Sequence, residues 1–325
     1  MPLLLEARDI HVAFGGGFGG GKRKLALAGV SLAIPAEPAT TTALVGESGS
    51  GKTTLARLLL GLRAPSAGSV AYDGVELAAM TKTQHMKFRR EVQSIFQDPF
   101  DVYNPFYRVD RALMMPLLRF GLASSRAEAG SRIDAALETV GLRPAETRGR
   151  YPHQLSGGQR HRVMIARALL LEPRVILADE PVSMVDASLR ATILETLHKL
   201  KTERGIALVY VTHDLATAYQ IADRVVVLYA GTIVEAGDAE QVIKHPKHPY
   251  TQALIAAIPE PDPSQPWGLE QSAAPPTAAS ATEQGGCPYA PRCAHAMAAC
   301  RARVPELRRI DGQDVACVLY EGTTR

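Results

Sequence analysis

The stretch GESGSGKTT, from Gly46 to Thr54, constrains the fold of this chain more than any other segment. It fits GxxxxGK[ST], follows an apolar run (41–45) that predicts a strand, and precedes a helix expected to begin near Lys52. Its glycines allow successive backbone N–H groups to surround phosphate oxygens at a helix N-terminus, where anions are favoured. The sequence therefore predicts a nucleotide-phosphate site formed by Gly46, Glu47, Ser48, Gly49, Ser50, Gly51, Lys52, Thr53 and Thr54. Lys52 would reach the β- and γ-phosphates, and the Thr53 hydroxyl would bind Mg²⁺.

Strands and helices alternate along most of the remaining chain. The runs RVILAD (174–179) and IALVYVT (206–212) predict buried strands, with an amphipathic helix between them at 187–203. This alternation predicts a parallel sheet with helices on both faces, an α/β fold. Residues 98–170 are predicted to be mostly helical, and RVVVLYAGTIVEAG is predicted to form a hairpin around Ala230-Gly231.

Two further strands are expected near the N-terminus, at 3–14 and 27–35. The joint between them contains a formal GxGxxG at Gly15, Gly17 and Gly20. A dinucleotide-binding site would need a helix after these glycines, but a second strand-like run follows instead. A flexible hairpin is therefore the favoured interpretation.

A pair of acids follows the predicted strand VILAD. Asp179 would hold Mg²⁺ directly or through water, and Glu180 is placed to polarise a water for attack on the γ-phosphate. Guanine recognition through an Asn-Lys-x-Asp motif is excluded, because the one asparagine of the chain is Asn104, in NPFY.

The segment LSGGQ, formed by Leu155, Ser156, Gly157, Gly158 and Gln159, precedes the helix RHRVMIARALL. Ser156 can cap that helix, and the two glycines can expose its amides to an anion. Together with GESGSGKTT, FQDP and VILADE in this order, the segment resembles the signature of ABC-type ATPases.

That resemblance covers residues 1 to about 255 and implies further roles. Gln97 would link Mg²⁺ and the attacking water to a transmembrane partner, Asp186 would lie in the inter-subunit loop, and His213 would be the switch histidine. Two ATPase domains would meet head to tail, so that the LSGGQ segment contacts ATP held by the partner. The adenine would stack on Phe14, with Phe18 as the alternative.

The fold implied is a RecA-like P-loop core with an antiparallel β subdomain, an inserted helical subdomain and a small Cys-rich module. The expected boundaries are 1–97 and 171–240 for the core, 98–170 for the helical subdomain with the signature, 241–260 for a helical extension, 261–286 for a linker and 287–325 for the Cys-rich module.

The extension HPKHPYTQALIAAIPEPDP (245–263) and the tail look like those of oligopeptide/dipeptide importer ATPases, whose relatives import nickel, opines and some oligosaccharides. His245 and His248 have near metal-like spacing, but a polar helix start is the favoured interpretation. The resemblance implies a peripheral ATPase at the cytoplasmic face of the membrane. Its partners would be two permeases, a second similar or identical ATPase, and a solute-binding protein reached through the permeases. The rival hypothesis is a soluble ABC-type ATPase that acts on DNA or ribosomes.

Composition bears on these partners. The net charge of +3 gives no strong electrostatic case for nucleic acid. No apolar run approaches the ~18 to 20 residues needed to cross a bilayer, and the N-terminus lacks the basic start of a signal peptide.

All four cysteines, Cys287, Cys293, Cys300 and Cys317, lie in the Cys-rich module. In a reducing cytosol such a cluster indicates metal ligands before disulfides. The absence of paired CxxC motifs counts against a zinc ribbon, and some members of the resembling family carry an iron–sulfur cluster. A [4Fe–4S] cluster is therefore favoured over zinc or metal-free thiols. The Pro- and Ala-rich stretch from Pro259 to Gly286 is expected to decouple this module from the core.

Overall fold

The computed structural model of the 325-residue chain describes residues 2–15, 24–97, 103–183, 185–258 and 285–321. The chain forms two compact units, each assembled from three separate stretches. Unit one comprises Met1–Leu5, Ile34–Thr41 and Ala71–Val211, and unit two comprises Glu6–Ala33, Thr42–Val70 and Thr212–Arg325.

Unit one contains a parallel set of strands in the order β8-β7-β6. These are β6 (Val92–Ile95), β7 (Val175–Asp179) and β8 (Ala207–Thr212). Val175 pairs with both Val92 and Ala207, and every residue of β8 is buried. Such continuous apolar strands are typical of a parallel sheet covered on both faces. A short hairpin joins the end of β4 (Ala67–Tyr72) to β5 (Val75–Glu76).

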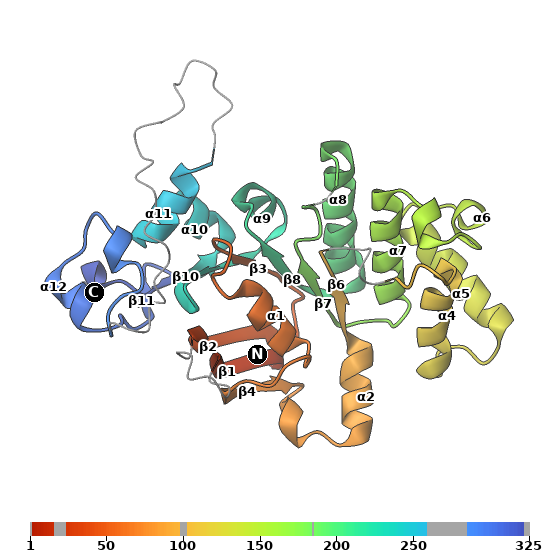
Figure 1. The fold of residues 1–325 in the computed structure, drawn as a ribbon, viewed down its shortest axis with the longest axis horizontal. Coiled ribbons are helices and arrows are strands. Elements are labelled where there is room, and N and C mark those ends of the chain that lie inside the picture. Colours follow the sequence, from red (N-terminus) through yellow and green to blue (C-terminus); the bar gives the residue numbers. More distant parts are fainter. Residues whose placement is uncertain (1, 16–23, 98–102, 184, 259–284, 322–325) are drawn as a thin grey trace, which may run out of the picture. The chain divides into compact units, whose positions relative to one another are not determined.

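The helices of unit one gather mainly between β6 and β7 in the sequence, as Figure 1 shows for α4 to α7. Their apolar faces form a small core in which Leu113, Ile133 and Val163 are fully buried. Arg148 ties two of these helices together, because it donates hydrogen bonds to Asp110 on α4 and Asp134 on α5. The helices are α2 (Lys82–Glu91), α4 (Val109–Arg119), α5 (Arg126–Thr139), α6 (Pro144–Thr147), α7 (Gly157–Leu169) and α8 (Ala187–Arg204), with 3₁₀ turns η1 (Leu77–Ala79) and η2 (Pro152–Gln154).

Unit two contains a strand set in the order β11-β12-β10-β9-β3. These strands are β3 (Thr41–Val45), β9 (Arg224–Tyr229), β10 (Thr232–Asp238), β11 (Arg308–Ile310) and β12 (Gln313–Val315). The pair β3–β9 is parallel, whereas β9–β10, β10–β12 and β11–β12 are antiparallel. Ala230 and Gly231 form the β9–β10 turn with φ of 45° and 84°, left-handed values that glycine adopts readily.

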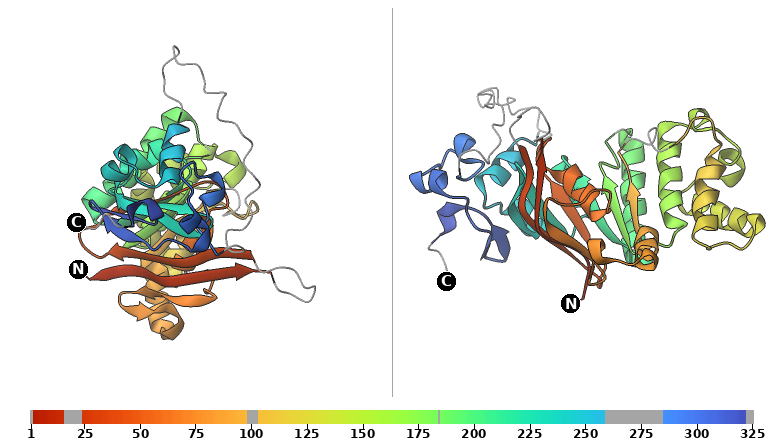
Figure 2. Two further views of the ribbon diagram at one scale, coloured as in Figure 1. Left: turned by 90° about the vertical axis from the view of Figure 1, so that its left-hand side faces the viewer. Right: turned by 60° about the horizontal axis from the view of Figure 1, so that its bottom comes forward.

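The remaining elements of unit two surround these strands. Figure 2 shows β1 (Leu3–Phe14) and β2 (Lys24–Pro35) side by side, with β4 as the next neighbour of β1. The helices are α1 (Lys52–Leu59), α9 (Leu215–Ile221), α10 (Ala239–Lys244), α11 (Pro249–Ala256) and α12 (Ala298–Ala302), with 3₁₀ turns η5 (Ala290–Arg292) and η6 (Val318–Tyr320).

The structure confirms most predicted elements. The strands at 41–45 and 174–179, the helices from Lys52 and from 187, and the hairpin at Ala230-Gly231 form as expected. Across the described segments, the helices are all too short or too polar to cross a membrane.

The prediction that the Cys-rich module is decoupled from the core was wrong. Strand β12 of the module pairs with β10, with Glu235 opposite Val315, and the N–H of Ala316 donates to the carbonyl of Val234 at 2.9 Å. The edge of β10 is thereby covered, which satisfies backbone groups that an exposed edge would leave to water. Sequence composition could show a linker but not where the segment after it returns.

Candidate nucleotide-binding and catalytic site

The loop from Gly46 to Gly51 connects β3 to α1 in a conformation that requires its glycines. Gly46 has φ of 146°, and a Cβ at this position would lie 2.2 Å from the carbonyl oxygen of Leu228. Gly51 has φ of 107°, and its Cβ would lie 2.8 Å from the carbonyl oxygen of Ala26. At Gly49 (φ of 81°) a Cβ would meet open space. The loop therefore depends on glycine for close backbone approach at two positions, and for a left-handed conformation at all three.

Polar groups inside this loop fit a phosphate ligand. The buried Lys52 Nζ donates to the carbonyls of Gly46 (2.6 Å) and Glu47 (3.0 Å), so the ammonium lies within the curve of the loop. The Ser50 hydroxyl is buried and has no hydrogen-bond partner among the described residues. Thr53 is exposed on the first turn of α1. An inward ammonium, an unsatisfied hydroxyl and a helix N-terminus together suit the phosphates of ATP and a bound Mg²⁺.

The predicted adenine contact lies at the end of β1. Phe14 is 43% exposed, and the guanidinium of Arg63 lies over its ring at 4.0 Å from the centroid. The ring is accessible enough to stack on a base. The alternative, Phe18, lies outside the described residues, as do Gly17 and Gly20.

The carboxylate predicted to polarise water lies at the end of β7. Gln97 Nε2 donates to Glu180 Oε2 at 3.0 Å, so the structure brings these two predicted residues together in unit one. Glu180 has φ of 46°, an uncommon conformation for a residue other than glycine. Its N–H donates to the carbonyl of Val211 (2.8 Å), and the Ser183 hydroxyl donates to its carbonyl (3.0 Å). Strained backbone fixed in this way is typical of functional sites.

The LSGGQ segment forms the start of α7. Ser156 Oγ accepts from the N–H of Gln159 (3.2 Å), and Gln159 Oε1 accepts from the N–H of Ser156 (2.9 Å), which makes a capping box. Ser156 and Gly157 are exposed, whereas Leu155 and Gly158 are buried. A Cβ at Gly158 would lie 1.8 Å from the side chain of Leu189, so this glycine permits helix packing. The predicted cap is confirmed, and the exposed part of the segment is available to a ligand.

The other predicted residues end or begin elements. Asp179 is the last residue of β7, and the exposed Asp186 precedes α8 without capping it through its side chain. His213 is exposed between β8 and α9, and the next residue, Asp214, caps α9 by accepting from the N–H of Ala216 at 2.9 Å.

The two histidines of the extension do not form a metal pair. His248 is buried and its Nδ1 accepts from the N–H of Tyr250 (3.0 Å), so it caps α11. Burial lowers the pKa of His248 to about 4. His245 follows the last residue of α10. The polar helix start expected from the sequence is confirmed.

The four cysteines gather in one small module, in which Cys300 packs with Ala290 and Val318 and against Cys287. Burial raises the pKa of Cys287, and the nearby thiols of Cys300 and Cys293 raise it further. Burial raises the pKa of Cys317 to about 11, with added effects from the three other thiols. The thiols thus lie within electrostatic reach of one another. Over the described ranges, however, no three or more His, Cys, Asp or Glu side chains are arranged to hold a metal ion.

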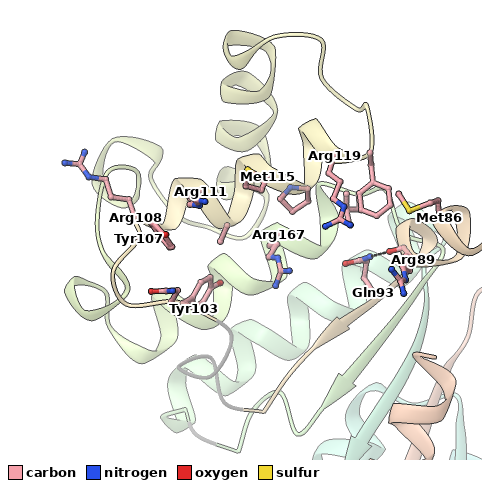
Figure 3. Close-up of a pocket in the computed structure, with 15 residues that line it drawn as sticks. Met86, Arg89, Gln93, Tyr103, Tyr107, Arg108, Arg111, Met115, Arg119 and Arg167 are labelled. Atoms are coloured by element: carbon pink, nitrogen blue, oxygen red, sulfur yellow. Dashed lines mark hydrogen bonds between the residues drawn. The ribbon is translucent and has the colours of Figure 1, made fainter. Parts of the chain in front are cut away.

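A second feature of unit one is a pocket of 530 Å³ beside α4 (Figure 3). Its side chains come from α2, β6, α4, α7 and the segments that join them. Of the described residues that line it, five are arginines and none is acidic: Arg89, Arg108, Arg111, Arg119 and Arg167. Apolar surface adjoins these cations, because Met115 and Tyr107 are about half exposed, and Arg111 lies over the Tyr107 ring at 4.0 Å.

Two residues that touch the phosphate loop were not expected from the sequence. Tyr250 on α11 accepts through its hydroxyl from the N–H of Glu47 at 2.8 Å. Arg292 of the Cys-rich module forms two hydrogen bonds with the Glu47 carboxylate, at 2.9 and 3.0 Å. No local signal marks either residue, because both contacts join positions more than 200 residues apart.

Similar proteins extend these observations. A family model described as ABC transporter matches residues 27–183, and one described as oligopeptide/dipeptide transporter, C-terminal region, matches residues 234–300. The Di/tripeptide transport ATP-binding protein DppF of Pseudomonas aeruginosa is 40% identical over 322 residues, which cover 98% of each chain. A putative peptide import ATP-binding protein of Brucella ovis is 43% identical over 276 residues, which cover 85% of this chain and 86% of that protein.

Among solved structures, the dimeric ATP-binding cassette MJ0796 in a post-hydrolysis state with ADP and Pi matches with a TM-score of 0.65 and 29% identity. The match covers 73% of this chain and 99% of that chain. The fold and the site thus define an ATP-hydrolysing cassette of the ABC type. More narrowly, the chain belongs to the family of ATP-binding subunits of oligopeptide/dipeptide transporters.

Proposed function

We propose that this chain hydrolyses ATP to drive the import of peptides, or of a related solute such as an oligosaccharide, an opine or nickel, through two membrane permeases. The observation that carries this proposal is the match to a di/tripeptide transport ATP-binding protein along 98% of the chain. The glycine-dependent phosphate loop and the Gln97–Glu180 contact support the ATPase part. The rival hypothesis of an ATPase acting on DNA or ribosomes is not favoured, since the relatives above are transport or import subunits.

The proposed roles of the site residues are those expected from the sequence. Phe14 stacks on adenine, and residues 46–54 bind the phosphates. Thr53, Gln97 and Asp179 would hold Mg²⁺, which would neutralise charge on the phosphate oxygens. Glu180 orients the attacking water and accepts its proton, and Gln97 positions that carboxylate. His213 is the switch histidine, which contacts the γ-phosphate.

We further propose that two ATPase subunits act together, and that the second is similar or identical to this chain. Leu155, Ser156, Gly157, Gly158 and Gln159 would contact ATP held by the partner subunit, and Asp186 would lie at the same interface. The exposure of Ser156 and Gly157 at the start of α7 supports this role, because a helix N-terminus favours an anion.

The pocket beside α4 is the proposed docking site of a permease. Two of its lining residues, Gln93 and Tyr103, lie on either side of Gln97 in the sequence. The pocket combines five arginines with exposed apolar side chains. A permease segment with acidic and apolar residues would complement it. Permeases would hold the ATPase at the cytoplasmic face of the membrane, and a solute-binding protein would deliver the solute to them.

The four cysteines remain candidate ligands of a [4Fe–4S] cluster, with zinc as the alternative. Their confinement to one module and their mutual electrostatic influence support this proposal, although the described residues show no arrangement of metal ligands. Protein purified without oxygen should contain about four iron and four sulfide per chain, and Cys300→Ser should abolish both. Stoichiometric zinc without sulfide would refute the cluster.

The ATPase proposal is tested at Glu180. Glu180→Gln should keep ATP binding but lower turnover by about a hundredfold or more, because the amide cannot accept a proton from water. The variant should accumulate as an ATP-bound pair of subunits in size-exclusion chromatography. Hydrolysis within a few-fold of wild type would show that Glu180 is not the catalytic carboxylate. Uptake of labelled dipeptides by cells that carry the whole transporter tests the transport part.

A further inference from the structure

The Cys-rich module touches the phosphate loop through one charged side chain. The guanidinium of Arg292 donates two hydrogen bonds to the Glu47 carboxylate, one to each oxygen, at 2.9 and 3.0 Å. Arg292 is 28% exposed and Glu47 is 43% exposed. A two-pronged contact between guanidinium and carboxylate is geometrically specific and stronger than a single ion pair.

Arg292 is well positioned for this contact by its surroundings. It ends η5, and its N–H donates to the carbonyl of Tyr289 at 2.9 Å. Its guanidinium lies 5.9 Å from the ring centroid of Tyr229 and 5.6 Å from that of Tyr289. These tyrosines pack with the buried Tyr250, with ring centroids 4.5 and 5.4 Å away. The aromatic cluster thus fixes the module against the core at the point where Arg292 emerges.

Both polar groups of the Glu47 backbone are hydrogen-bonded. Its N–H donates to the Tyr250 hydroxyl (2.8 Å), and its carbonyl accepts from Lys52 Nζ (3.0 Å) and from the N–H of Ser50 (3.1 Å). Its side chain, however, places a negative charge in a loop that must bind a polyanion. An unpaired carboxylate there would repel the triphosphate, whereas a paired one contributes far less repulsion.

We propose that Arg292 is a positioning residue for ATP binding, which neutralises Glu47 and fixes it beside the phosphates. The ATP affinity of the loop then depends on the correct placement of the Cys-rich module. This inference rests on the proposed function, since it assumes that the Gly46–Thr54 loop binds ATP.

Equilibrium binding of MgATP to the full-length chain tests the proposal. Arg292→Ala should weaken binding roughly three- to tenfold, because it exposes the Glu47 charge to the phosphates. Arg292→Lys, which keeps the charge but loses the second hydrogen bond, should weaken binding by about twofold or less. The loss in Arg292→Ala should shrink in high salt, since the repulsion acts through partly exposed groups.

The decisive variant is the double substitution Arg292→Ala with Glu47→Gln. Removal of the carboxylate should restore ATP affinity to within about twofold of wild type, an outcome that loss of module docking alone would not give. Arg308→Ala is the matched control: it removes another arginine of the module, which pairs with Glu306 and should leave ATP affinity unchanged.

These outcomes distinguish a failure of the proposed ATPase function from a failure of the role of Arg292. Failure of the wild-type chain to bind ATP would overturn the proposed function itself. Wild-type binding with unaltered affinity in Arg292→Ala would overturn only the role of Arg292. Weak binding that Glu47→Gln does not rescue would show that Arg292 acts by docking the module, and charge neutralisation would be refuted.

Discussion

Gly46→Ala tests whether the phosphate loop depends on close approach to β9. An alanine at φ of 146° adopts a backbone conformation that costs about 1–2 kcal/mol for a residue with a Cβ. The Cβ would also lie 2.2 Å from the carbonyl oxygen of Leu228, a fully buried residue of β9. Ordinary contacts lie at ~3.5 Å or more, so loop or strand must move by about 1 Å. Such overpacking costs a further ~1–3 kcal/mol.

Gly49→Ala is the matched control, because its φ of 81° is also left-handed but its Cβ would meet open space. Gly49→Ala should lower the free energy of unfolding only by the conformational cost of about 1–2 kcal/mol, whereas Gly46→Ala should lower it by about 2–5 kcal/mol in total. Urea unfolding of both variants measures the free energies. ATP affinity of Gly46→Ala should fall at least about tenfold, as measured by calorimetry, because the displaced loop no longer aims its N–H groups. Equal unfolding free energies for the two variants would refute the argument.

Further predictions concern the signature, the extension and the arginine pocket. Ser156→Arg should leave ATP binding to the chain's own loop within about twofold but abolish hydrolysis at a partner's site, because a bulky cation blocks the γ-phosphate; lost binding in the isolated variant would contradict the assignment in trans. His248 has a folded pKa of about 4, below the usual 6.5, so its contribution to stability is full above pH ~6.5 and is lost as pH falls through about 4. His248→Asn keeps a capping oxygen without titrating and should remove about 3 kcal/mol of this acid sensitivity in pH-dependent urea unfolding; an unchanged pH profile would exclude His248 as its source. Arg119→Glu should prevent copurification with the permeases while ATP binding persists. Arg126→Glu, which lies outside the pocket, should still copurify with them. If both variants copurify equally well, the docking site lies elsewhere.

Much of the candidate nucleotide site could be predicted because its motifs are formed by residues close together in the sequence. The phosphate loop joins adjacent elements, so GESGSGKTT between an apolar strand and a helix was enough to predict the loop. The cap formed by Ser156 and Gln159 spans three residues and needs no tertiary contact. The order of these motifs was enough to indicate the ABC family, whereas the roles of Glu180 and His213 stay predictions.

Other features depend on residues that the sequence separates widely. Gln97 meets Glu180 across 83 positions, and only the family resemblance pointed to that glutamine. The flexible joint around Gly17 and the alternative adenine contact Phe18 lie outside the described residues, so both stay predictions.

By itself, the sequence determined that a glycine-rich loop between a strand and a helix, an acidic pair at a strand end and a capped helix at LSGGQ would form, because each is built from contiguous residues whose backbone preferences agree. Only the tertiary structure decided that the Cys-rich module joins β10 and reaches Glu47 through Arg292, 245 positions away. The pairing of a strand edge or of one arginine with one carboxylate is set by which surfaces meet after folding, and no local pattern encodes that meeting.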